Sequence, residues 1–147
     1  MTRSKLLGCL LGLSSMLLPA RLALGDAPGS PAGPSNEAFL GVWAVEVTPD
    51  QAAMAAGRNA FKDFVLFEAD GKFTAEAFGP MGFGQSEFTV TELDGAMYAF
   101  STTMTNPTQG TLVWNGVRQG NEIVGTLVWT KSDGAVGTYS FRAEQLD

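Results

Sequence analysis

Apolar and polar residues alternate along most of the chain beyond residue 38, in short runs separated by turns that contain glycine. The turns recur roughly every 8–14 residues, a spacing typical of an all-β sandwich or barrel. The pattern predicts eight strands, which span Leu40–Val47, Phe64–Glu68, Lys72–Phe78, Gln85–Glu92, Ala96–Met104, Gly110–Val117, Glu122–Thr130 and Ala135–Gln145.

One short helix is predicted between the first two strands. Thr48 and Gln51 have the spacing of a capping box, and Pro49 suits the first helical position. Gly57 suits the end of the helix, so a helix of about two turns is expected, and it is the single helix expected in the folded domain.

Three predicted turns share an Asp-Gly pair, at residues 68–72, 92–96 and 131–135. Each could hold a two-residue loop, or a three-residue loop whose glycine has a positive φ and forms a bulge. The bulged register is favoured because it places aromatic and apolar residues opposite one another. The expected pairs are Phe67 with Phe73, Phe88 with Phe100, and Leu127 with Tyr139.

The bulged register gives one apolar face and one threonine-rich face. A meander of this kind closes most simply into an eight-stranded up-and-down antiparallel β-barrel, which removes the edge strands. A two-sheet β-sandwich is the alternative.

The sequence Gly-Thr-Leu-Val-Trp occurs twice, at 110–114 and 125–129, and each glycine is expected to give room to a neighbouring aromatic ring. The predicted apolar face consists of Val65, Phe67, Phe73, Ala75, Phe88, Val90, Tyr98, Phe100, Leu112, Trp114, Ile123, Leu127, Trp129, Tyr139 and Phe141.

The first 25 residues have the features of a secretory signal peptide. Arg3 and Lys5 precede an apolar segment from Leu6 to Leu18, and small residues lead to a cleavage site after Gly25. Residues 26–37 are rich in proline and glycine and are predicted to form a disordered tether, followed by a β-barrel domain at 38–147. We therefore expect a secreted or periplasmic protein that is not inserted in the membrane after signal cleavage.

Composition and charge exclude several functions. The chain has 15 acidic and 9 basic residues, a formal net charge of −6 and no histidine, which argues against nucleic-acid binding. Its one cysteine, Cys9, lies in the predicted signal peptide, so no Ser-His-Asp or Cys-His catalysis and no Cys/His zinc site is expected. The carboxylates are assigned to turns and solvated faces. The prediction is a protein that is not an enzyme, with no metal and no cofactor.

The candidate binding residues that remain are aromatic. Three Trp, ten Phe and two Tyr could fill the barrel completely or line a pocket for a small apolar ligand. Met81 and Phe83, in a glycine-rich connection, are expected to be exposed on the rim, where they could contact a ligand or a partner. The candidate ligand-binding residues are Phe67, Tyr98, Phe100, Trp114, Trp129 and Tyr139.

Gly41-Val42-Trp43 on the first strand and Arg142 on the last resemble the lipocalin and calycin superfamily. The resemblance implies a barrel in which an arginine late in the last strand packs across the ring of Trp43. The predicted function is therefore non-catalytic binding of a small apolar ligand in an aromatic-lined interior. The alternative is a structural or protein-interaction module with a filled core that acts through its rim loops.

Overall fold

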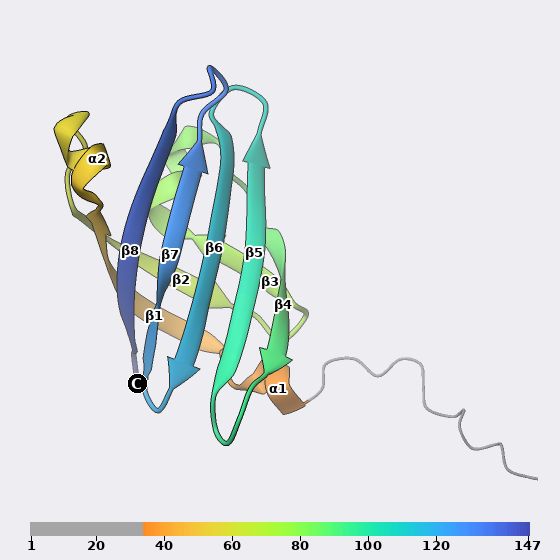
Figure 1. Cartoon of the computed structure of the whole chain (residues 1–147). Coiled ribbons are helices and arrows are strands. Elements are labelled where there is room, and N and C mark those ends of the chain that lie inside the picture. The colour runs from red at the N-terminus through yellow and green to blue at the C-terminus, as the bar shows by residue number, and fades with distance from the viewer. Residues whose placement is uncertain (1–33) are drawn as a thin grey trace, which may run out of the picture. The chain divides into compact units, whose positions relative to one another are not determined.

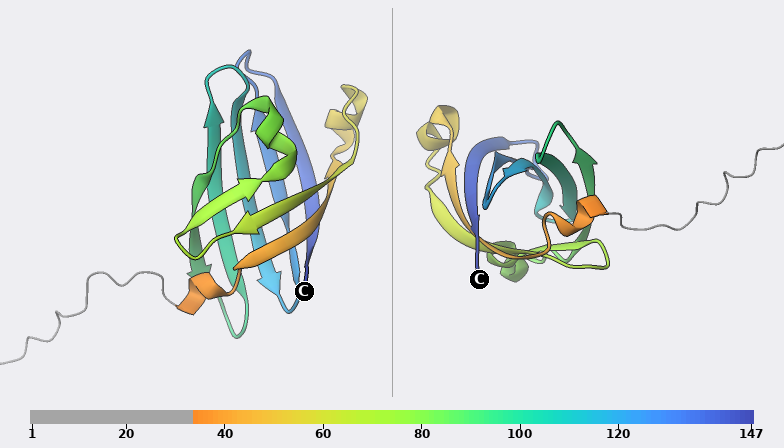
Figure 2. Two further views of the ribbon diagram at one scale, coloured as in Figure 1. Left: turned by 180° about the vertical axis from the view of Figure 1, so that it is seen from behind. Right: turned by 90° about the horizontal axis from the view of Figure 1, so that it is seen from below.

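Residues 34–147, the part of the chain that the computed structural model describes, form a closed antiparallel β-barrel. Each strand pairs with the next along the chain, and β8 pairs with β1 (Figure 1; Figure 2, right). The predicted up-and-down barrel is thus confirmed, and the sandwich is excluded. The strands are β1 Gly41–Pro49, β2 Phe61–Phe67, β3 Lys72–Ala75, β4 Ser86–Glu92, β5 Tyr98–Asn106, β6 Gly110–Gln119, β7 Glu122–Thr130 and β8 Val136–Gln145.

Three short helical segments accompany the strands, where one was predicted. They are α1 Pro34–Glu37, α2 Gln51–Ala55 and the 3-10 helix η2 Glu76–Met81. The α1 segment falls within the predicted tether, whereas the predicted signal peptide (1–25) and residues 26–33 lie outside the described residues. None of the helices in the described domain is long and apolar enough to cross a membrane.

Two helix details differ from the sequence expectations. The N-cap of α2 is Asp50, whose Oδ1 accepts a hydrogen bond from the Ala53 N–H at 2.7 Å, so the expected capping box at Thr48 is not used. Pro49 ends β1, because the strand continues further along β8 than expected.

The third strand ends at Ala75, three residues earlier than predicted, because η2 turns the chain back across the barrel end.

The strand register agrees with the bulged turns at two hairpins and differs at the third. Phe67 pairs with Phe73, and Leu127 pairs with Tyr139, as predicted. In the hairpin between β4 and β5, Phe88 pairs with Thr102 instead of Phe100. The Thr102 hydroxyl donates to the Glu87 carbonyl at 2.7 Å, which holds this register. A slip of two residues preserves the faces, so the predicted apolar face still points inward.

The repeated glycines of β6 and β7 allow the backbone of a neighbouring segment to lie very close to them. A Cβ on Gly125 would lie 1.9 Å from the Asn115 carbonyl oxygen, and one on Gly110 would lie 2.0 Å from the Thr130 carbonyl oxygen. The expectation that these glycines make room for aromatic rings is therefore wrong. That role belongs to Gly116, where a Cβ would lie 2.8 Å from an atom of the Phe100 ring.

Aromatic rings fill the barrel and close both of its ends. At the α1 end, the fully buried Phe39 packs on Phe67 and Phe100 with ring centroids 5.3 Å apart. At the opposite end, η2 inserts Phe78, which contacts Trp114 at 6.2 Å and Trp129 at 5.5 Å. Centroid distances of 4.5–7 Å are the preferred range for aromatic pairs, so these rings form one packed core.

The arginine that covers Trp43 is not the one expected. Arg142 lies on the outer wall, where its guanidinium pairs with the Glu122 carboxylate. The guanidinium of Arg118, on β6, lies 5.2 Å from the centre of the Trp43 ring. Side chains alternate along β8, and Arg142 lies between the inward-facing Phe141 and Ala143, which explains why it cannot reach the interior.

This geometry predicts unequal effects of removing the two arginines. Arg118→Ala should lower the free energy of unfolding by about 1–2 kcal/mol, because it removes a cation–π contact with a buried indole. Arg142→Ala should cost only about 0.5 kcal/mol, because it removes a solvent-exposed ion pair. Urea denaturation of the two variants measures the difference, and equal losses would contradict the assignment.

Candidate functional site

The six aromatic residues predicted to bind a ligand do not converge on one site. Three of them belong to the packed core, with exposed fractions of 1–3%: Phe67, Phe100 and Trp114. Tyr98 is half-buried and pairs with Arg118 on β6, near the α1 end of the barrel. Only Trp129 and Tyr139 line a groove, which lies at the opposite end.

This groove, which we call the mouth groove, has a volume of about 400 Å³. It lies between the loop that follows α2 and the helix η2, and Figures 1 and 2 show that both segments are at the same end of the barrel. Its volume falls within the range of small-molecule sites. The residues that line it are Gly57, Arg58, Asn59, Phe61, Lys62, Ala77, Phe78, Met81, Trp129 and Tyr139.

The floor of the mouth groove is a set of aromatic side chains held in fixed orientations. Phe61 packs edge-on against Phe78 at 5.8 Å and against Tyr139 at 6.1 Å. The Trp129 indole N–H donates to the Gln109 carbonyl oxygen at 2.8 Å, which orients the ring. The floor is therefore formed before any ligand arrives, which lowers the entropic cost of binding.

Two cations flank the Trp129 ring. The Arg58 guanidinium lies 5.7 Å from the ring centre, and the Lys131 ammonium lies 4.6 Å from it. Both side chains are half-buried, and neither makes an ion pair with any residue in 34–147. Lys62, the other cation at the groove, pairs with Glu46 at 3.6 Å.

The two residues predicted for the rim have different surroundings. Met81 is 41% exposed and lines the mouth groove. Phe83 is buried, with 4% of its surface exposed, which corrects the expectation that it is exposed. Its ring packs edge-on against Phe78 at 5.9 Å, because η2 and the following Gly82, with a φ of 95°, turn the chain inward.

Sequence reasoning missed two residues that line the groove, Arg58 and Phe78, and also Lys131, which packs on the Trp129 ring. Lys131 carried a usable signal, because a residue two positions after Trp129 tends to project from the same face of an extended chain. Phe78 lies in a predicted strand, whereas in the structure its role depends on the η2 turn. Arg58 is brought to Trp129 only by closure of the barrel, so no local pattern could have identified it.

A buried acid on β2 is hydrogen-bonded to the backbone of Ala77, a residue that lines the mouth groove. Asp63 projects inward from β2 with 4% of its surface exposed, and its Oδ1 accepts 2.7 Å hydrogen bonds from the Phe64 and Ala77 N–H groups. Its Oδ2 has no hydrogen-bond partner within the described domain. Burial, assisted by the Glu76 charge, raises the pKa of Asp63 to about 6, against the opposing effect of the two backbone bonds.

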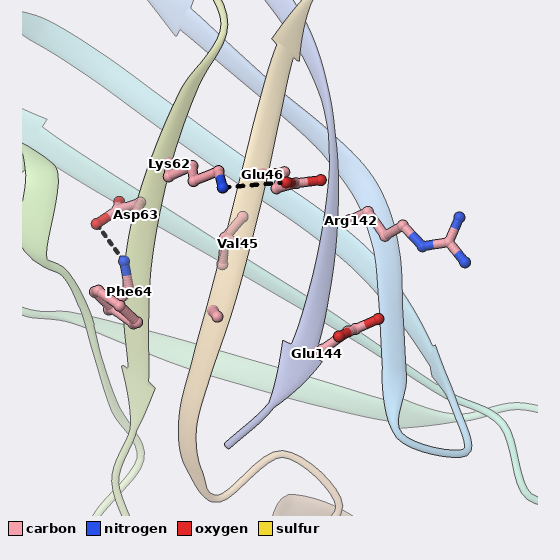
Figure 3. Close-up of a pocket in the computed structure, with 8 residues that line it drawn as sticks. Val45, Glu46, Lys62, Asp63, Phe64, Arg142 and Glu144 are labelled. Carbon is pink, nitrogen blue, oxygen red and sulfur yellow. Dashed lines mark hydrogen bonds and ion pairs between the residues drawn. The ribbon is translucent and has the colours of Figure 1, made fainter.

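A second hollow lies on the outer wall of the barrel, over β8, β1 and β2. Its volume is about 340 Å³, and Figure 3 shows Glu46, Lys62, Arg142 and Glu144 around it. Its cations are already engaged, Lys62 with Glu46 and Arg142 with Glu122. In the same view the Asp63 carboxylate points away from Arg142 and Glu144. The hollow therefore has fewer unpaired cations available to a ligand than the mouth groove has.

Comparisons with known proteins add no functional assignment. Within residues 34–147, no group of three or more His, Cys, Asp or Glu side chains could hold a metal ion. No protein-family model, curated protein or solved structure matches the chain significantly. The established description is thus a small eight-stranded antiparallel β-barrel with a buried aromatic core and an apolar groove at one end.

Proposed function

We propose that this protein is a non-enzymatic binding protein for a small apolar molecule, and that the ligand docks in the mouth groove. With the predicted signal peptide, the proposal describes an exported protein, secreted or periplasmic, that acts as a soluble carrier or sensor. A binding role also agrees with the resemblance to the lipocalin superfamily, but the site is moved from the barrel interior to its rim.

The observation that carries the proposal is the coexistence of a filled interior with an open aromatic groove. Phe67 contacts the rings of Phe73 and Phe100 at 5.0 and 4.9 Å, so the space in which a central ligand was expected is occupied by side chains. At the mouth, by contrast, the half-buried Phe61 and the exposed Met81 leave apolar surface accessible to solvent. Covering such surface is favourable by about 25 cal/mol per Å².

A protein-interaction role through the same end of the barrel is the second candidate. Met54 on α2 is 54% exposed and Met81 on η2 is 41% exposed, and flexible methionine side chains suit adaptable contact surfaces. This role would use the outer surfaces of α2 and η2, while a small ligand would use the floor of the groove.

The indole N–H resonances test the proposal directly, because the chain has three tryptophans. Trp129 lies at the groove, whereas Trp43 and Trp114 are buried with 0% and 1% of their surfaces exposed. Titration of the ¹⁵N-labelled protein with a panel of small aromatic and aliphatic compounds should shift the Trp129 indole peak more than the other two.

Assignment of the three peaks comes from single Trp→Phe variants, and the matched control is the Trp43 peak at the far end of the barrel. Unchanged spectra across the whole panel would contradict ligand binding. A shift confined to Trp114 would place the ligand in the core and contradict the mouth groove as its site.

A further inference from the structure

We propose that the mouth groove selects a small aromatic anion, a flat apolar body that carries one carboxylate, sulfonate or phosphate group. This inference rests on the proposed function and adds the chemical class of the ligand. It is carried by the arrangement of Arg58 and Lys131 around Trp129.

The two cations beside Trp129 have no partner of opposite charge within residues 34–147. Both are half-buried against the Trp129 ring, at 5.7 and 4.6 Å from its centre, and neither has a carboxylate partner within residues 34–147. Partial burial of a cation without a counter-ion is unfavourable, and the indole face compensates only in part. An anion that reached both groups would therefore gain charge-assisted hydrogen bonds that the protein itself does not supply.

The charges at the mouth groove differ in sign from the net charge of the protein. The chain has more acidic than basic residues, yet no Asp or Glu belongs to the described lining of the mouth groove. Six Lys and Arg residues follow the predicted signal peptide; Arg58 and Lys62 line the groove, and Lys131 packs on the ring of Trp129. Lys62 pairs with Glu46, so Arg58 and Lys131 are the cations beside the groove that have no ion-pair partner within residues 34–147, and they favour an anion at this position.

The floor of the mouth groove has a shape that suits a planar aromatic molecule. Phe61, Phe78 and Tyr139 meet at edge-on angles of 75–78°, an arrangement that presents both ring faces and ring edges. A planar aromatic body can continue this pattern of edge-to-face contacts, which stabilise aromatic pairs beyond the area that they bury. The site combines such a floor with two cations that pack on the Trp129 ring, so its complement is an aromatic ring system with a single anionic group.

The test compares two probes that differ in charge and share one ring system, 2-naphthoate and 2-naphthamide. Isothermal titration calorimetry of the full-length protein after signal cleavage measures both affinities at pH 7.5. We expect naphthoate to bind at least about tenfold more tightly than naphthamide, since charge-assisted hydrogen bonds exceed neutral ones by about this factor. The Trp129 indole peak should shift with both probes.

Variants identify the residues responsible. In R58Q/K131Q the affinity for naphthoate should fall to within about threefold of that for naphthamide, while naphthamide affinity stays nearly unchanged. The matched control is R142Q, which removes a cation from the outer wall and should leave both affinities as they are. The indole spectrum of each variant verifies that it is folded.

The outcomes separate this inference from the proposed function. If the wild-type protein binds both probes equally well, or if R58Q/K131Q retains the preference for naphthoate, the anion selectivity is wrong and the apolar site survives. If neither probe nor any other compound of the panel binds, the proposed function itself fails. The comparison of the two probes on the wild-type protein decides the question even if the double variant does not fold.

Discussion

Gly125→Ala is expected to lower the free energy of unfolding by roughly 3 kcal/mol or more, a large fraction of the roughly 5–15 kcal/mol that stabilises an ordinary domain. The added methyl carbon would lie 1.9 Å from the Asn115 carbonyl oxygen and 2.6 Å from the Gly116 Cα. Both atoms belong to the backbone of β6, so no side-chain rotation can relieve the overlap. The strands β6 and β7 would have to separate where Gly116 pairs with Gly125.

Gly84→Ala is the matched control. Its Cβ would meet nothing within 4 Å, and its backbone needs no positive φ, so we expect a change within about 0.5 kcal/mol. Chemical denaturation monitored by circular dichroism measures both variants. A Gly125→Ala protein as stable as the Gly84→Ala protein would show that β6 and β7 do not approach as closely as described.

The architecture was predictable from sequence because alternation and turn chemistry act locally. Phe73 and Tyr139 lie between polar neighbours, so the inward faces of their strands follow from a period of two. Closure of the barrel followed from the need to remove strand edges. The slip in the β4–β5 hairpin was not predictable in this way, because a two-residue shift preserves the faces and depends on the hydrogen bond of Thr102 to Glu87.

The candidate site was less predictable because it depends on contacts between segments distant in sequence. Composition indicated an aromatic interior, but whether rings fill a barrel or line a cavity is decided by packing in three dimensions. The insertion of Phe78 by η2 and of Phe39 beyond α1 closes both ends, and neither segment was expected to be helical. Trp129 and Tyr139 were identified as ligand candidates by type, and the structure places them at the groove.

Asp63→Asn should remove a pH dependence of stability that the wild-type protein shows between pH 4 and pH 7. The pKa of Asp63 is about 6 in the folded protein, against 3.8 for an ordinary aspartate. Burial favours the neutral acid, so the folded protein binds this proton more tightly than the unfolded chain does. The stabilisation by the proton is therefore complete below pH 4 and is lost as the pH rises through 6.

The expected magnitude follows from the difference between the two pKa values. About two pKa units correspond to roughly 3 kcal/mol of unfolding free energy that Asp63 costs the protein at neutral pH relative to acid pH. The amide of the Asp63→Asn variant cannot ionise, and its oxygen can still accept the hydrogen bonds from Phe64 and Ala77. The stability of the variant relative to wild type should thus rise by up to about 3 kcal/mol between pH 4 and pH 7.

Urea denaturation of both proteins from pH 3.5 to pH 7.5 measures this relative stability, which cancels the titration of the carboxylates that they share. Asp133→Asn is the matched control, because the Asp133 Oδ1 also accepts a backbone hydrogen bond, from Ala135 at 2.9 Å, but its side chain is exposed. A constant difference between wild type and Asp63→Asn across this range would mean that Asp63 has the same pKa in the folded and the unfolded protein, and that solvent reaches its side chain. Protonation of Asp63 would then not affect the link between β2 and η2 through the Ala77 N–H, and the wall of the mouth groove would be insensitive to pH.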